Sequence, residues 1–107
     1  MKVSIITCTY NSAKTVGEAL DSLVSQTYDD IESIVIDGGS QDNTLEVVSS
    51  YKDLVSKVVS EADKGIYDAL NKGISLATGD VIGILHSDDI LASDDVISRV
   101  VQCFDPS

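Results

Sequence analysis

The chain has few basic residues: 7 lysines and arginines stand against 18 aspartates and glutamates, with a formal net charge of -11 over 107 residues. A field of this sign repels polyphosphate backbones and anionic lipid surfaces. We therefore expect no binding of nucleic acid or lipid by this segment. An anionic ligand would need a divalent cation in order to bind beside so many carboxylates.

Other absences narrow the classes of protein further. No apolar run is long enough to span a bilayer and no charged-then-apolar leader opens the chain, so we expect a soluble, cytoplasmic segment. The glycine fingerprints of dinucleotide-binding folds and Walker-type phosphate loops are missing as well. The two cysteines, Cys8 and Cys103, have no metal-ligand spacing, and we expect reduced, partly buried thiols.

Strand and helix patterns alternate along the chain with short connections. Strands are predicted at residues 3–7, 31–36, 55–59 and 81–85, and helices at about 14–26, around Leu45, Val48 and Tyr51, at 65–77 and after Ser93. This order predicts an α/β fold, with a parallel sheet of about four strands and right-handed crossovers. The apolar run at 81–85 is predicted to be a buried strand. The length allows one domain, or part of one.

The helix patterns predict which side chains face the core and how the helices end. The inward positions are Val16, Ala19, Leu20, Leu23 and Val24 in the first helix, Ile66, Ala69, Leu70, Gly73, Ile74 and Ala77 in the third, and Val96, Ile97, Val100, Val101 and Phe104 in the last. Gly79 is predicted to end the third helix in a left-handed cap. Ser93 is predicted to cap the last helix, with Asp94 and Asp95 in its first turn and Pro106 closing it.

Three polar loops follow predicted strands: Thr9-Tyr10-Asn11, Asp37-Gly38-Gly39-Ser40 and Ser87-Asp88-Asp89. The carboxyl ends of parallel strands lie on one edge of a sheet, which is where open α/β sheets bind ligands. We therefore expect the three loops to form a single site.

Asp37 has two interpretations. It precedes two glycines, so a ligand can approach the backbone closely there, and a carboxylate, which accepts hydrogen bonds, suits the N3-H of uracil. Alternatively, Asp37 is a turn residue that caps the next helix, a role that Ser40 or Asp42 could also fill. The residues alone leave both interpretations open.

Asp88 and Asp89 form an adjacent acidic pair directly after a predicted strand. Most such pairs on loops are solvated turn residues. Two carboxylates this close repel each other unless a cation or a proton intervenes, and hard oxygen ligands suit Mg²⁺ or Mn²⁺. A metal ion held there could bridge a diphosphate and stabilise it as a leaving group.

Three further features have an ordinary structural interpretation beside a functional one. His86 is a general base or ligand, or else a strand-end residue that makes one hydrogen bond. Asp68 and Lys72 are spaced i,i+4 and predict a surface ion pair on a helix. Lys64 and Gly65 open the third helix, whose N-H groups bind a phosphate or simply begin the helix.

These motifs stand in an order that resembles a known family. They are Ser4 to Asn11, Ile36 to Thr44, Glu61 to Asp80 and Leu85 to Asp89. Together they resemble the family 2 glycosyltransferases of the GT-A fold. The third motif resembles the subgroup that acts in bacterial surface-polysaccharide synthesis.

The resemblance implies metal-dependent, inverting transfer of a sugar from a nucleoside-diphosphate donor, foremost a UDP-sugar, to a hydroxyl of a carbohydrate or lipid-linked acceptor. It implies that Tyr10 stacks on the base, that Asp37 binds uracil and that Asp89, with Asp88, holds Mg²⁺ or Mn²⁺. The donor-binding residues would be Cys8, Thr9, Tyr10, Asn11, Asp37, Gly38, Lys64, Gly65 and Asp88. Ser87 occupies the first position of the usual Asp-x-Asp, and Cys8 replaces a frequent proline. The expected location is cytoplasmic, with any attachment to the inner face of the membrane made by parts outside this chain.

Enzymes of this type are longer than this chain, and their catalytic base lies downstream of the metal motif. We therefore predict that residues 1–107 are the nucleotide-sugar-binding N-terminal part of a GT-A domain, an incomplete domain whose base lies beyond Ser107. One alternative is a non-catalytic module that binds nucleotide-sugar or pairs with another polypeptide, including a second copy, through uncovered surface. Another is a phosphoacceptor receiver domain, which the absence of an acidic pair after the first strand disfavours.

Overall fold

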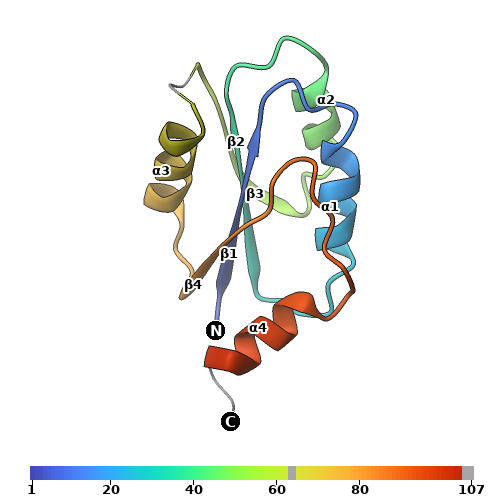
Figure 1. Cartoon of the computed structure of the whole chain (residues 1–107), viewed down its shortest axis with the longest axis vertical. Helices are drawn as coiled ribbons and strands as arrows, with labels where there is room; N and C mark the ends of the chain where they lie inside the picture. Colours follow the sequence, from blue (N-terminus) through green and yellow to red (C-terminus); the bar gives the residue numbers. More distant parts are fainter. Residues whose placement is uncertain (63–64, 105–107) are drawn as a thin grey trace.

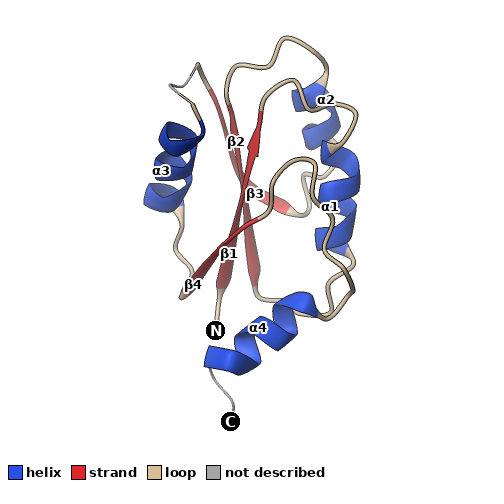
Figure 2. Cartoon of the chain, viewed as in Figure 1, coloured by secondary structure: helices blue, strands red, loops and turns tan. Residues whose placement is uncertain are grey.

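The computed structural model is a four-stranded parallel sheet with helices on both faces (Figures 1 and 2). It describes residues 1–62 and 65–104. The elements follow one another as β1 (Val3–Thr9), α1 (Val16–Val24), β2 (Ile31–Asp37), α2 (Thr44–Ser49), β3 (Val55–Ser60), α3 (Ile66–Leu76), β4 (Val81–Ile84) and α4 (Val96–Phe104). The predicted fold class and the order of its elements are confirmed. None of the described helices is long and apolar enough to cross a bilayer.

The sheet order β3-β2-β1-β4 places β1 and β2 at the centre. Both are buried almost throughout, because α3 covers one face and α1 and α2 cover the other (Figure 1). Ile6 and Ile36 face α3, whereas Val35 packs against α1 and α2. The parallel register sets Thr9 beside Asp37 at the carboxyl end of the two strands.

β4 is an edge strand, so the prediction of a buried strand at 81–85 was wrong in this respect. It lies beside β1, and Ile82 and Ile84 are 43% and 48% exposed because α3 packs mainly on β1 and β2. An apolar run indicates a strand, but its place in the sheet depends on how the other strands assemble.

The predicted helix faces are less buried than expected. Val24 of α1 and Ile66 and Ile74 of α3 are exposed, and Ile97 is the one fully buried residue of the predicted α4 face. Cys103 is exposed on α4, in contrast to its predicted position. Short helices at the rim of a small sheet contact it through a narrow stripe, so helical periodicity overstates their burial.

Gly79 does not form a left-handed cap. α3 is followed by Ala77 in an extended conformation, and the described glycines with positive φ are Gly39 and Gly65. Gly79 instead lies against β1, where a Cβ atom would stand 2.8 Å from the backbone nitrogen of Ser4. Glycine is needed there for close approach of two backbone segments.

The start of α4 also differs from the prediction. The Ser93 hydroxyl donates to Asp95 Oδ1 at 2.6 Å instead of capping the helix. Asp94 and Asp95 form a turn before Val96, the first helical residue, so they do not lie in the first turn of α4. Pro106 lies outside the described residues.

Candidate functional site

A pocket of about 530 Å³ opens at the carboxyl edge of the sheet, between the ends of β1 and β2 and the amino end of α3. Five residues predicted to contact a donor line it: Cys8, Thr9, Tyr10, Gly38 and Gly65. Ala62, Ile66 and Ala69 complete the described lining and make one wall apolar. Concave, mostly apolar pockets with a few polar groups are the usual form of small-molecule sites.

Asp37 is fully buried below this pocket and accepts five hydrogen bonds. Its Oδ1 accepts from the hydroxyls of Thr9 (2.7 Å) and Ser40 (2.5 Å). Its Oδ2 accepts from the N-H groups of Gly39 (3.1 Å) and Ser40 (2.8 Å) and from the Ser60 hydroxyl (2.9 Å). Burial by itself raises the pKa of the Asp37 carboxyl, but the hydrogen bonds from Ser40, Thr9 and Ser60 outweigh it and lower the pKa.

This geometry corresponds to the turn interpretation of Asp37. The carboxylate has no exposed surface and both oxygens have partners, so it could accept from a base only after losing bonds that hold the turn. These bonds give Asp37 a structural role in the turn, and its contact with uracil stays a prediction. Through Thr9, which it binds directly, and the adjoining Gly38, Asp37 shapes two parts of the pocket lining.

Asn11 holds the loop after β1 in its conformation. Its φ of 47° lies in the left-handed region, which asparagine tolerates better than most residues. Its N-H donates to the Ser40 hydroxyl and its Oδ1 accepts from the Gln41 N-H, both at 2.8 Å. Asn11 is absent from the described pocket lining, whereas the neighbouring Tyr10 is 59% exposed at the pocket and can offer its ring to a ligand.

The loop after β4 joins the same edge through Ser87. The hydroxyls of Ser12 and Ser87 lie 3.0 Å apart, so the predicted convergence of the three loops is confirmed. Asp88 and Asp89 are exposed in a turn in which the Asp89 N-H donates to the His86 carbonyl at 3.0 Å. Neither aspartate forms part of the described pocket lining, and His86 is exposed as well.

The side chains at this edge that could ligate a metal suit an ion held jointly by protein and ligand better than an ion held by the protein alone. Among residues 1–62 and 65–104, no three His, Cys, Asp or Glu side chains lie close enough to hold a metal ion. Asp88 and Asp89 offer two exposed carboxylates. Mg²⁺ is typically bound by one or two carboxylates together with water and substrate phosphates. The pair therefore suits an ion that a bound diphosphate helps to coordinate.

The amino end of α3 borders the pocket through Gly65 and Ile66. Gly65 has φ +114°, and a Cβ there would meet no atom within 4 Å, so the backbone conformation and not space requires glycine. A helix amino terminus favours negative charge, which suits a phosphate group near this wall. Lys64, also expected to contact the donor, lies outside the described residues.

Lys72 connects α3 to the loop that precedes it. Its Nζ lies 3.6 Å from Asp68, which confirms the predicted i,i+4 pair. It also lies 3.1 Å from Glu61, directly after β3. The contact with Glu61 links α3 to the segment that follows β3.

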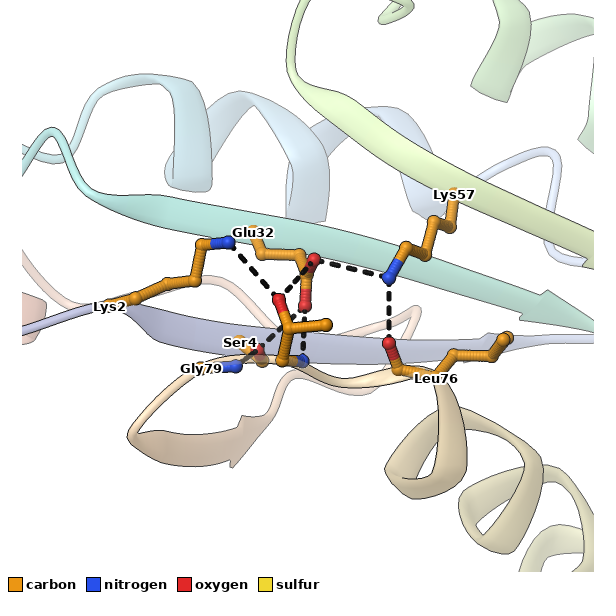
Figure 3. A network of polar contacts seen from close by, with 7 residues as sticks. Lys2, Ser4, Glu32, Lys57, Leu76 and Gly79 are labelled. Carbon is orange, nitrogen blue, oxygen red and sulfur yellow. Dashed lines mark hydrogen bonds and ion pairs between the residues drawn. The ribbon is translucent and has the colours of Figure 1, made fainter.

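At the opposite edge of the sheet, Glu32 ties the far end of α3 to the strands (Figure 3). It accepts from the Thr78 N-H and the Ser4 hydroxyl, both at 2.9 Å, and pairs with Lys57 at 3.3 Å. The Lys57 ammonium also donates to the Leu76 carbonyl at the end of α3 (2.7 Å). The Thr78 N-H is the largest cause that lowers the Glu32 pKa, and with Ser4 and Lys57 it overcomes burial to bring the pKa to about 2.

Sequence reasoning missed Ser60 and Ala62, which bring the end of β3 into the site. Ser60 ends β3 and binds Asp37, and Ala62 lies on the loop that follows and lines the pocket. The same rule that selected the other three loops applies here, because β3 is also parallel. The weak strand pattern of β3 and the small, uncharged side chains of Ser60 and Ala62 gave no signal for these two contacts.

Comparison with known proteins agrees with this architecture. Residues 4–106 match the profile of the family described as Glycosyl transferase family 2. A PGL/p-HBAD biosynthesis glycosyltransferase of Mycobacterium bovis is 38% identical over 100 residues, which are 91% of this chain and 39% of that protein.

Two solved structures superpose closely on the chain. S. aureus TarS in complex with UDP-GlcNAc is 28% identical with a TM-score of 0.90, over 99% of this chain and 32% of that one. Mannosyltransferase PcManGT from Pyrobaculum calidifontis, in complex with GDP-Man and Mn²⁺, is 30% identical with a TM-score of 0.87, over 94% of this chain and 31% of that one. The chain thus spans less than half the length of each of these proteins.

Proposed function

The chain belongs to glycosyl transferase family 2, and from that premise we propose that it is the nucleotide-sugar-binding N-terminal part of a GT-A glycosyltransferase. The observation that carries the proposal is that one edge of the sheet holds the pocket lined by Tyr10, the amino end of α3, and the loop that bears the exposed pair Asp88 and Asp89. An aromatic ring suits the base of a donor, and a helix amino terminus suits its diphosphate. A carboxylate pair suits the metal ion that accompanies the diphosphate.

In this proposal the base lies in the pocket, against the Tyr10 ring and the apolar wall at Ile66. Thr9 and Gly38 shape the floor, and Asp37 holds them in place from below. The likeness to complexes with UDP-GlcNAc and with GDP-Man supports a nucleoside-diphosphate sugar. Of the two, we propose a UDP-sugar, in keeping with the motifs of the sequence.

Asp88 and Asp89 are proposed to hold Mg²⁺ or Mn²⁺, a role supported by the Mn²⁺ in the PcManGT complex. The ion supplies positive charge that stabilises the diphosphate as it leaves. The two carboxylates also require a cation before an anionic donor can bind beside them, since the chain carries a net charge of -11.

The acceptor side of the reaction is proposed to use polypeptide outside these 107 residues. No carboxylate or imidazole is present in the described pocket lining, so the base that deprotonates an acceptor hydroxyl would come from elsewhere. We propose inverting transfer in the cytoplasm to a carbohydrate or lipid-linked saccharide, in bacterial surface-polysaccharide synthesis. The motif at 61–80 supports this pathway, and the biosynthetic name of the mycobacterial relative is compatible with it.

Calorimetric titration of UDP into the folded chain, with and without Mn²⁺, tests the proposal. We expect Mn²⁺ to tighten binding by about tenfold or more. Asp89→Asn should remove this metal dependence, whereas Asp94→Asn should keep it, because Asp94 is an exposed acid in the turn before α4. Equal UDP affinity with and without Mn²⁺ in the wild-type chain would contradict the proposed metal site. A complete lack of UDP binding would contradict the proposed donor site.

A second candidate function is a non-catalytic module that pairs with another polypeptide or a second copy. It is favoured by the exposed isoleucines Ile82 and Ile84 on the edge strand β4, together with Phe104, which is 62% exposed on α4. Sedimentation measurements distinguish the two candidates, because a strictly monomeric, well-folded chain would count against the second. The family match removes the receiver-domain alternative.

A further inference from the structure

We infer that α1 orders the acidic loop, defined here as residues 85–92, and that Ser22 and Gln26 are positioning residues for Asp88 and Asp89. This inference rests on the proposed metal role of the two aspartates. It assigns a task to polar side chains that lie away from the pocket and that no sequence motif indicated.

The acidic loop runs alongside α1 on its way from β4 to α4 (Figure 1) and is attached on both sides of the acidic pair. Before the pair, Ser87 contacts Ser12, whose carbonyl accepts from the first helical N-H of α1, that of Val16, at 2.9 Å. After the pair, the Leu91 N-H donates to the Ser22 hydroxyl at 3.1 Å. α1 and Ser12, to which its first residue is hydrogen-bonded, therefore hold both sides of the turn that carries the carboxylates.

Gln26 extends this attachment to the start of α4. It is 8% exposed, and its Nε2 donates to the carbonyls of Ser93 (2.7 Å) and Ser22 (3.2 Å). Its Oε1 accepts from the Ile97 N-H at 3.0 Å. A buried amide whose donor and acceptor both have partners fixes one arrangement of the surrounding backbone. Gln26 thus locks the chain that leaves the acidic loop against the end of α1.

Attachment at both ends matters because the aspartates themselves are exposed. The described hydrogen bond within their turn runs from the Asp89 N-H to His86, and the carboxylates face solvent. If a loop becomes ordered only when an ion binds, the loss of conformational entropy weakens the binding of that ion. By holding the loop beforehand, Ser22 and Gln26 should tighten metal binding without touching the metal or the nucleotide.

The first test measures the Mn²⁺ concentration that half-saturates the metal-dependent binding of UDP to the full 107-residue chain. Ser22→Ala removes the bond to Leu91, and Gln26→Met removes those to Ser93 and Ile97. Each substitution should raise this concentration by about five- to tenfold and leave metal-free binding of UDP unchanged. Ser22→Thr keeps the hydroxyl and should restore the wild-type value. Ser25→Ala is the matched control, because the Ser25 hydroxyl bonds the Asp21 carbonyl within the same helix end and does not contact the loop.

A general loss of structure would weaken both metal-dependent and metal-free binding of UDP. A loss confined to metal-dependent binding therefore indicates a positioning role and not a folding defect. An unchanged Mn²⁺ requirement in folded Ser22→Ala and Gln26→Met would overturn the inference. Should Gln26→Met fail to fold, Ser22→Ala decides alone.

The second test does not need a ligand. Amide hydrogen exchange at residues 86–92 should accelerate by about tenfold in Ser22→Ala and Gln26→Met and stay unchanged in Ser25→Ala. If the wild-type chain shows no metal-dependent binding, the proposed function fails, yet this measurement still decides whether α1 orders the loop. Equal exchange in all variants would refute the positioning role.

Discussion

Thr9 Oγ1 lies 2.7 Å from Asp37 Oδ1, and this hydrogen bond joins the carboxyl ends of the two central strands directly below the pocket. The same carboxylate accepts from Ser60 at the end of β3. One buried side chain therefore sets the relative positions of three strand ends. The candidate site is therefore built around a buried carboxylate that holds its neighbours in place.

Asp37→Asn should lower the free energy of unfolding at pH 7 by about 2 kcal/mol or more, because an amide NH₂ then faces groups that can only donate, such as the Ser40 N-H. The pKa of Asp37 is lowered in the fold, so its contribution is present above its ordinary value of 3.8 and fades as pH falls below it. Urea unfolding at several pH values checks this. Asp53→Asn, at an exposed turn position, should change little. A folded, fully stable Asp37→Asn with weakened UDP binding would return Asp37 to the base-binding role.

Tyr10→Ala should weaken binding of UDP by about tenfold, since stacking of a base on an aromatic ring contributes about 1–3 kcal/mol. Tyr10→Phe keeps the ring and should bind like the wild-type chain. Both variants should unfold at the wild-type urea concentration, because Tyr10 is 59% exposed. Equal affinities for the alanine and phenylalanine variants would show that the ring does not stack on the base.

Glu32→Gln should destabilise the fold in a pH-dependent way. The pKa of Glu32 is about 2 in the fold against an ordinary value of 4.5, so the ionised form stabilises the protein above pH 4.5 and this stabilisation is lost as pH falls toward 2. We expect a deficit of about 2 kcal/mol at pH 7 that narrows below pH 4. Glu46→Gln, at an exposed position of α2, is the control. A deficit of constant size between pH 7 and pH 3 would contradict the role of the charge.

Gly73→Ala and Gly17→Ala should change stability in opposite directions. A Cβ at Gly73 would stand 2.6 Å from Cγ2 of the buried Ile6, so α3 must shift away from β1 at a cost of about 1–3 kcal/mol. At Gly17 of α1 the nearest atom, the Tyr51 hydroxyl oxygen, is 3.6 Å away, and alanine should stabilise the helix by about 0.5–1 kcal/mol.

Urea unfolding of both variants, with UDP titration of Gly73→Ala, checks this pair of predictions. Because α3 forms one wall of the pocket, Gly73→Ala should also weaken nucleotide binding, and Gly17→Ala should not. Two variants of equal stability would show that α3 can retreat from β1 without cost.

Much of this site could be predicted from the chain alone. The strands and helices follow from local periodicity, and the loops of Tyr10, Asp37 and Ser87 converge because parallel strands end at one edge. The role of Asp37 could not be predicted in this way. Its two interpretations differ in whether the carboxylate faces a ligand or its own turn, and that depends on Thr9 and Ser60, which are distant in sequence.

The alternation of elements, the parallel sheet and the identity of the polar loops all follow from the order of residues, because each depends on short-range pattern and on the chirality of crossovers. Three features become visible only in the assembled fold: β4 lies at an edge, Asp37 accepts hydrogen bonds from distant residues, and Gln26 accepts from the backbone of α4. The physical reason is the same in all three cases. Burial and hydrogen-bond partnership are properties of pairs of segments, and the pairs form only when the sheet is assembled.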